Sequence, residues 1–234
     1  MVVLGGTSGE RAVSLDSGKA CIKALKKIGY IVSTFDPKKK NFNMINKKKV
    51  DVIFNALHGR DGEDGVAQSY FEYLKIPYTH SGVISSFNSM NKIYSKELFI
   101  KNNIKTPKYI SLRRAHFNNK SILKILTKKQ IKFPVVSKPI NEGSSLGVNI
   151  SKNKDKLFKS INSLFKKYDE IIIEEYKGGQ EIQVAVINGK PIGAIELIPK
   201  RFFYDYKAKY TKKAKTKHVM PARLSKKKYK EVLN

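Results

Sequence analysis

Residues 135–148 read Val-Val-Ser-Lys-Pro-Ile-Asn-Glu-Gly-Ser-Ser-Leu-Gly-Val, and this stretch decides how the chain is interpreted. An apolar run ends at Lys138 and Pro139, a turn of small residues follows at 142–145, and a second strand-like run occupies 147–151. A lysine beside a turn rich in backbone N–H and hydroxyl donors is suited to holding phosphate oxygens. Because the turn joins two strands, it is not an ordinary P-loop. It predicts a lid over nucleotide phosphates, and a plain β-hairpin with a Gly/Ser turn stays equally open from these residues alone.

The net charge of +28 is carried almost entirely by lysines spread along the whole chain. Such a charge first indicates nucleic acid or another polyanion as a partner. The lysines do not form one stripe, and the sequence has no Arg-Gly repeat and no zinc-finger spacing. We therefore expect the lysines to lie on solvent-exposed faces, and we expect no nucleic-acid partner. The alternative is a basic protein that binds nucleic acid or another polyanion.

Three features of the sequence indicate the cellular compartment. Cys21 is the single cysteine, so no intrachain disulfide can form and a reducing compartment fits. Residues 1–6 have no basic segment and include two glycines, which is unlike a secretory signal. No apolar run reaches the roughly 18 residues that a membrane span needs. We expect a cytoplasmic protein with no membrane partner.

The first third of the chain alternates strands and helices. Strands are predicted at 2–4, 30–35 and 51–57, and helices at 14–28 and 66–74. Ser14 is expected to cap the first helix and Gly29 to end it. The inner face of that helix is expected to comprise Ala20, Ala24, Leu25 and Ile28. Strand–turn–helix units of this length predict a parallel sheet, whose ligands bind at the carboxyl ends of the strands.

From about Phe87 the pattern changes to antiparallel strands with helices. Helices are predicted at 85–90 and 92–101, strands at 109–112 and 170–176, and an amphipathic helix around 157–168. A hairpin over 181–198 turns at Asn188 and Gly189. These elements predict an α+β unit after the α/β unit.

Four segments together resemble the D-alanine–D-alanine ligase family, which are ATP-grasp enzymes of peptidoglycan synthesis. The segments are 4–14, 57–65, 135–148 and 204–210, and they occur in the family's order and with similar spacing. The resemblance implies a Rossmann-like α/β N-terminal domain with a parallel sheet, followed by an α+β ATP-grasp domain that is incomplete at the C-terminus. We expect an N-terminal substrate-binding domain at 1–87, a central ATP-grasp subdomain at 88–177 and the start of a C-terminal subdomain at 178–234.

The activity that the resemblance implies is the ATP-dependent ligation of two D-alanines. The carboxylate of the first D-alanine attacks the γ-phosphate of ATP, and the amine of the second then displaces phosphate from the acyl phosphate. The substrates are D-alanine and ATP, Mg²⁺ or Mn²⁺ neutralises the phosphates, and a homodimer is suggested. Another ATP-grasp carboxylate–amine ligase is the alternative within this class, and the tyrosine-containing loop at 204–210 argues against it.

The resemblance also implies roles for individual residues. Glu10, Ser144 and Tyr210 match catalytic positions, and Glu10 and His58 match positions that bind D-alanine. The positions that match ATP-binding residues are Lys92, Lys138, Ser145, Glu174, Glu175, Tyr176, Glu181 and Lys209. Without the resemblance, Glu10 would be read as a first-turn glutamate favoured by the helix dipole.

One part of the family pattern is missing. The family's Arg-x-Asp and Glu-x-Asn strands, which carry the metal ligands, do not occur in this sequence. No metal ligand is therefore named, and the expected ligands lie beyond Asn234. We expect the 234-residue chain to have little or no activity, which D-alanine-dependent ADP release would measure.

Overall fold

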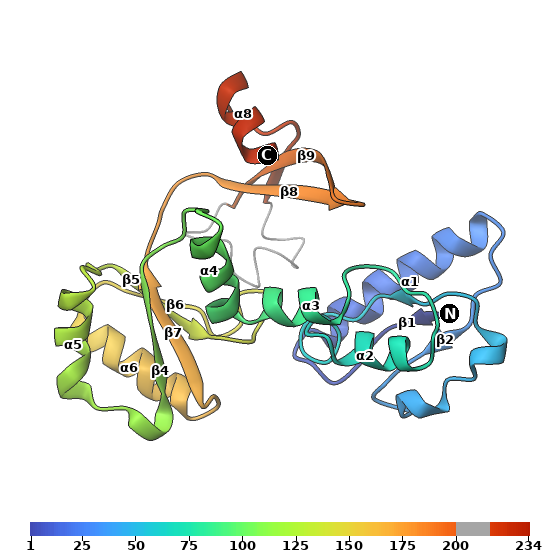
Figure 1. Cartoon of the computed structure of the whole chain (residues 1–234), viewed down its shortest axis with the longest axis horizontal. Coiled ribbons are helices and arrows are strands. Elements are labelled where there is room, and N and C mark those ends of the chain that lie inside the picture. Colours follow the sequence, from blue (N-terminus) through green and yellow to red (C-terminus); the bar gives the residue numbers. More distant parts are fainter. Residues whose placement is uncertain (200–215) are drawn as a thin grey trace. The chain divides into compact units, whose positions relative to one another are not determined.

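The computed structural model describes residues 1–199 and 216–234, which form two compact units, Met1–Glu175 and Tyr176–Asn234 (Figure 1). Unit 1 contains separate hydrophobic cores in its first and second halves. The predicted boundaries at 87/88 and 177/178 stay predictions. In the described residues, no helix is both long and apolar enough to cross a membrane.

The first half of unit 1 is built on a three-stranded parallel sheet with the order β2-β1-β3. Its strands are β1 (Val2–Val3), β2 (Thr34–Phe35) and β3 (Phe54–Asn55). The helical elements beside them are α1 (Arg11–Lys27), α2 (Val66–Tyr73) and the 3₁₀ turns η1 (Phe42–Met44) and η2 (Lys47–Lys49). The parallel sheet is confirmed. The strands predicted at 30–35 and 51–57 are wrong in length, since only two residues of each form a strand.

Helix α1 begins at Arg11, so the prediction that Ser14 caps it is wrong. Ser14 is fully buried inside the helix, where its hydroxyl donates to the Ala56 carbonyl at 2.6 Å and accepts from the Gly5 N–H at 2.8 Å. The residue at the N-cap position is Glu10. This earlier start places Glu10 directly at the carboxyl edge of the sheet.

The predicted inner face of α1 is also wrong, except for Leu25. Ala20, Ala24 and Ile28 are exposed. The residues that face the sheet are Leu15, Gly18, Ile22 and Leu25. The helix approaches β1 so closely that a Cβ at Gly18 would lie 2.7 Å from the Leu4 Cβ.

Gly18→Ala is therefore expected to destabilise the protein although alanine favours helix. Overpacking typically costs about 1–3 kcal/mol, and the helix-propensity gain is only about 1 kcal/mol. We expect a net loss of up to about 2 kcal/mol in the free energy of unfolding by urea. Lys19→Ala, at an exposed neighbouring position, is the control and should change it by less than about 0.5 kcal/mol. Equal stabilities for the two variants would contradict the close packing.

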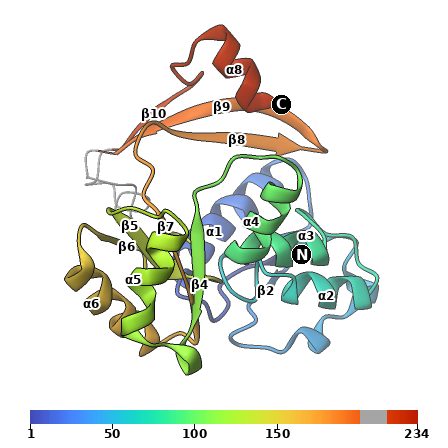
Figure 2. The ribbon, with the colours of Figure 1, turned by 60° about the vertical axis from the view of Figure 1, so that its left-hand side comes forward.

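The second half of unit 1 contains a four-stranded antiparallel sheet with the order β4-β7-β5-β6 (Figures 1 and 2). The strands are β4 (Tyr109–Arg113), β5 (Val135–Pro139), β6 (Asn149–Ser151) and β7 (Glu170–Glu175). The helices are α3 (Val83–Met90), α4 (Lys92–Lys101), α5 (Asn119–Lys128) and α6 (Lys154–Phe165), and the 3₁₀ turn η3 is Arg114–His116.

The core of this half joins α5 and α6 to the sheet. Its members include Leu126 of α5, Ile161 of α6, and Ile171 and Ile173 of β7. The predicted hairpin at 135–151 is confirmed, because β5 pairs antiparallel with β6. Its turn therefore follows a strand that is anchored in the core.

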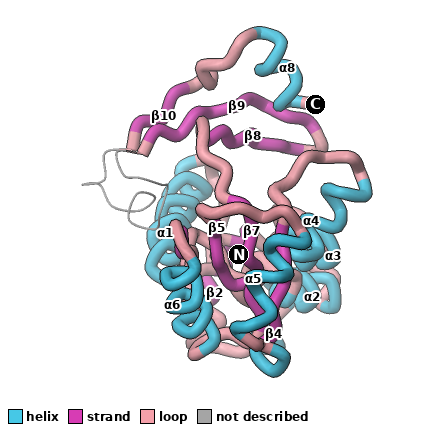
Figure 3. Tube along the Cα trace, turned by 90° about the vertical axis from the view of Figure 1, so that its left-hand side faces the viewer, coloured by secondary structure: helices cyan, strands magenta, loops and turns pink. Residues whose placement is uncertain are grey.

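The described residues of unit 2 form an antiparallel sheet with the order β10-β9-β8, and helix α8 lies over it (Figure 3). The elements are β8 (Glu181–Ile187), β9 (Lys190–Ile198), β10 (Lys217–Val219) and α8 (Lys226–Leu233). The hairpin at Asn188 and Gly189 is confirmed. Buried Glu196 accepts 2.8 and 3.1 Å hydrogen bonds from the Arg223 guanidinium, which lowers the pKa of Glu196 to about 2.

Candidate active site

Glu10 and Ser144 contact each other although they are 134 positions apart in the chain. Glu10 lies at the start of α1 and is only 3% exposed, while Ser144 lies in the turn between β5 and β6. The Ser144 hydroxyl donates to Glu10 Oε1. A buried carboxylate is a good partner for a cationic ligand group, because charge-assisted hydrogen bonds gain strength away from water.

Two glycines make room for the Glu10 carboxylate. A Cβ at Gly143 would lie 2.6 Å from Glu10 Oε2, and a Cβ at Gly59 would lie 2.8 Å from the same atom. Gly59 also has a φ of +69°, whereas Gly143 is outside the left-handed region. Sequence reasoning did not single out these glycines. The signal that could have found them is that each lies in a turn facing Glu10 in the implied fold.

His58 lies on the loop after β3. Its Nε2 is 3.0 Å from the Ser17 hydroxyl of α1, and its Nδ1 is 3.7 Å from Glu63 Oε1. Glu63 accepts the Gly59 N–H at 2.8 Å, and burial raises the pKa of Glu63. His58 is thus held beside the Glu10 loop by α1 and by its own loop.

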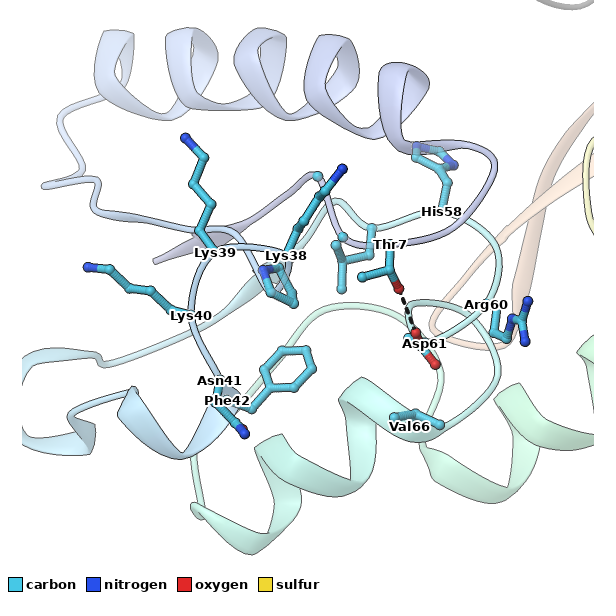
Figure 4. Close-up of a pocket in the computed structure, with 14 residues that line it drawn as sticks. Thr7, Lys38, Lys39, Lys40, Asn41, Phe42, His58, Arg60, Asp61 and Val66 are labelled. Carbon is cyan, nitrogen blue, oxygen red and sulfur yellow. Dashed lines mark hydrogen bonds between the residues drawn. The ribbon is translucent and has the colours of Figure 1, made fainter.

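A pocket of about 400 Å³ opens at the carboxyl edge of the parallel sheet (Figure 4). Its wall includes His58 and Asp61 after β3 and Thr7 after β1, and the Thr7 hydroxyl donates to Asp61 Oδ2 at 2.9 Å. Lys39 and Lys40 line the rim, but Figure 4 shows their ammonium groups pointing away from its centre. The open space therefore lies where the parallel sheet predicts a ligand.

A second cluster gathers around the end of β5. The Lys138 ammonium pairs with Glu174 Oε1 of β7. The Lys92 ammonium, at the start of α4, donates to the carbonyls of Glu142 at 2.6 Å and Ile140 at 3.3 Å. Burial, and next the positive charge of Lys138, lowers the pKa of Lys92 to about 8. Two ammonium groups close enough to repel each other are suited to sharing an anionic ligand.

The lowered pKa of Lys92 predicts that anion binding depends on pH. Lys92 loses its charge as the pH rises through 8, so an anion held by Lys92, such as the ATP that the family resemblance implies, should bind more weakly above that pH. We expect the Kd for ATP to rise between pH 7 and 9.5, by at most about tenfold per pH unit. Lys92→Arg keeps its charge over this range and should flatten the profile. Identical profiles for the two proteins would contradict this assignment.

Sequence reasoning missed Lys96, which belongs to the same cluster. Its ammonium is 2.9 Å from Glu174 Oε2 and donates to the Thr106 hydroxyl at 2.8 Å and the Pro107 carbonyl at 2.9 Å. A signal was present in the sequence, because Lys96 follows Lys92 by four residues and so lies on the same face of α4.

The turn between β5 and β6 has an unusual backbone. Ser144 and Ser145 have φ values of +46° and +61°, and Gly147 has +71°. Left-handed backbone is uncommon for serine, and such strain gathers at functional sites. A Cβ at Gly147 would lie 2.9 Å from the Pro139 ring, so the turn packs closely against the end of β5.

The remaining predicted residues lie on β7, in unit 2 and in the segment at 200–215. Glu175 ends β7, where its N–H donates to the Lys108 carbonyl at 3.0 Å. Tyr176 begins unit 2, and Glu181 is an exposed residue at the start of β8. Lys209 and Tyr210 lie outside the described residues. Within residues 1–199 and 216–234, no three His, Cys, Asp or Glu side chains form a group that could hold a metal ion.

Two family models match this chain. The one described as D-ala D-ala ligase N-terminus matches residues 32–81, and the one described as D-ala D-ala ligase C-terminus matches residues 98–234. The chain belongs to the D-alanine–D-alanine ligase family. The predicted parallel α/β domain followed by an ATP-grasp domain is thereby confirmed.

Curated members of the D-alanine–D-alanine ligase family include similar sequences. The ligase of Pelagibacter ubique is 54% identical over 226 residues, which cover 97% of this chain and 73% of the relative. The ligase of Trichlorobacter lovleyi is 40% identical over 99% of this chain and 72% of the relative. The chain thus spans about three quarters of the length of these relatives.

Solved structures of the D-alanine–D-alanine ligase family agree with the fold. The ligase of Bacillus anthracis superposes with a TM-score of 0.82 at 34% identity, covering 99% of this chain and 74% of that one. A D-alanine–D-alanine ligase of Bacillus anthracis complexed with ATP gives 0.74 at 30% identity, covering 96% of this chain and 70% of that one. VanG D-Ala:D-Ser ligase of Enterococcus faecalis gives 0.78 at 27% identity, covering 99% and 78%.

Proposed function

We propose that this chain binds ATP and D-alanine as substrates of the ligation that forms D-alanyl-D-alanine, the reaction for which its relatives are named. The observation that carries the proposal is that the turn between β5 and β6 contacts both the Glu10 carboxylate and the Lys92 ammonium. Residues 142–147 place Ser144 on the buried Glu10 carboxylate and the Glu142 carbonyl on the Lys92 ammonium. An amino-acid site and a phosphate site therefore share one loop.

The lysine cluster fits the phosphates of ATP. Lys92 and Lys138 supply two positive charges, and the charge of Lys138 disfavours that of Lys92. Phosphate oxygens between them would remove this repulsion and accept their hydrogen bonds. The N–H groups of the adjacent turn would add donors.

The Glu10 site fits the ammonium group of the first D-alanine. Its carboxylate is buried, oriented by Ser144 and enclosed by Gly59 and Gly143. In the proposed reaction a carboxylate oxygen of that D-alanine attacks the γ-phosphorus, and ADP leaves. The amine of the second D-alanine then attacks the acyl carbon, loses a proton, and phosphate leaves. The residues named here contribute mostly position and charge.

Several further assignments belong to this proposal. Mg²⁺ or Mn²⁺ would neutralise phosphate charge during transfer, and we name no ligand for it among the described residues. A cytoplasmic location and a homodimer are proposed from the family alone. Tyr210 and Lys209 would act from the segment outside the described residues.

Ligand binding to the purified chain tests the proposal. Isothermal titration calorimetry with ATP, and then with D-alanine in the presence of a non-hydrolysable ATP analogue, should show saturable binding of both ligands. Glu10→Gln should abolish the D-alanine signal and leave ATP binding within about threefold, because it removes the charge that faces the ammonium. L-alanine should give no signal.

The competing results are distinct. ATP and heparin binding with the same steep salt dependence would favour a general polyanion-binding protein instead. A D-serine signal stronger than the D-alanine signal would assign a different second substrate.

A further inference from the structure

One carboxylate in the second cluster is shared by two lysines. Glu174 Oε1 contacts the Lys138 ammonium, and Glu174 Oε2 contacts the Lys96 ammonium at 2.9 Å. The Glu174 side chain is only 9% exposed, so the solvent contributes little to balancing its charge. Two ammonium groups and one carboxylate leave the trio with one positive charge.

Lys96 is not available to a ligand. Its side chain is 7% exposed, and its ammonium is directed to three oxygens of Glu174, Thr106 and Pro107. Three acceptors use all three N–H donors of a lysine ammonium. The ammonium also lies 5.2 Å from the centre of the Tyr109 ring, which adds a favourable cation–π contact. Lys96 therefore ties α4 to β7 and to the segment before β4.

Lys138 is placed differently. Its side chain is 20% exposed, and it lies at the end of β5, directly before the turn that carries Ser144. Its neighbour Lys92 feels its positive charge. Of the two lysines that contact Glu174, only Lys138 is placed to meet an incoming phosphate.

We propose that Lys96 is a positioning residue. It pairs with the Glu174 oxygen that does not contact Lys138, balances the charge of that carboxylate, and so keeps the Lys138 ammonium available for the phosphates of the nucleotide. Without Lys96, Glu174 would have Lys138 as its only cationic partner in this trio, and the two charges would cancel. With Lys96, the same carboxylate orients Lys138 without neutralising it. The inference rests on the proposed function, since it assumes that nucleotide phosphates bind at Lys138.

The test compares ATP with adenosine in four proteins by titration calorimetry. Lys96→Met removes the buried charge and keeps the length of the side chain. We expect it to raise the Kd for ATP at least about tenfold and to leave the Kd for adenosine within about twofold. Lys96→Met with Glu174→Gln restores the single positive charge of the trio. The ratio of its Kd for ATP to its Kd for adenosine should therefore return to within about threefold of the ratio in the unsubstituted chain, because adenosine reports any contact of Glu174 with the nucleoside. Lys159→Met, at an exposed position on α6, is the matched control.

The possible outcomes distinguish the proposed role of Lys96 from the proposed binding of ATP by the chain. Loss of ATP and adenosine binding together in Lys96→Met, without recovery in the double variant, would reduce Lys96 to a structural residue and overturn the inference. Unchanged ATP affinity in Lys96→Met would overturn it as well. No ATP binding by the unsubstituted chain would instead contradict the proposed function. Thermal unfolding of each variant, measured under the titration conditions, shows whether that variant is folded when its binding is compared.

Discussion

Lys138→Met is expected to weaken ATP binding by about 10- to 100-fold. A hydrogen bond to a charged group is worth about 1.5–3 kcal/mol, and this substitution removes such a donor at the end of β5. It also leaves Glu174 paired with Lys96, so the remaining pair carries no net charge. Adenosine, which lacks phosphates, should bind equally well to both proteins.

The comparison needs a variant that loses the same charge elsewhere. Lys159→Met removes one exposed lysine from α6 and should change the Kd for ATP by less than about twofold at 0.15 M salt, where distant charges are screened. Titration calorimetry of both variants measures the difference. A similar loss in both would mean that general charge, and not the Lys138 position, holds ATP.

Gly143→Ala is expected to lower the affinity for D-alanine by about 10- to 100-fold, as measured in the presence of the non-hydrolysable ATP analogue. The new methyl group would lie 2.6 Å from Glu10 Oε2, closer than real contacts allow. Because Gly143 is outside the left-handed region, the backbone is not the source of the effect. The carboxylate must therefore move away from its contact with Ser144.

The control for this substitution is Gly82→Ala. A Cβ at Gly82 would meet only ordinary contacts, at 3.7 Å from Glu72 and Tyr78 atoms. Gly82→Ala should leave D-alanine binding within about twofold. If Gly143→Ala bound D-alanine as well as this control does, the position of the Glu10 carboxylate would not matter for the ligand.

The sequence was most informative where a pattern is local. The hairpin from 135 to 151 could be predicted because an apolar run, a turn of small residues and a second run are adjacent in the chain. The parallel order of β1, β2 and β3 followed from alternating strands and helices in the same way. Both patterns express backbone preferences and hydrophobic periodicity.

The errors arose where tertiary contacts overrule local preference. Ser14 is a residue type that often caps helices. Its hydroxyl instead donates to the carbonyl of Ala56, which follows β3, and Ser14 therefore lies on the buried face of α1. The role of Lys96 could not be predicted from the sequence, because it depends on an ion pair with Glu174, 78 positions later in the chain. Gly143 likewise owes its importance to Glu10, which no local pattern reveals.

The most direct test of the central claim is a lysine footprint of the whole chain with and without ATP. Acetic anhydride at pH 8 labels accessible neutral amines, and peptide mass spectrometry reads out each position. The account predicts that saturating ATP protects Lys92 and Lys138 and leaves exposed Lys159 unchanged. Uniform protection of all three lysines, or labelling of Lys92 and Lys138 that ATP does not alter, would contradict it.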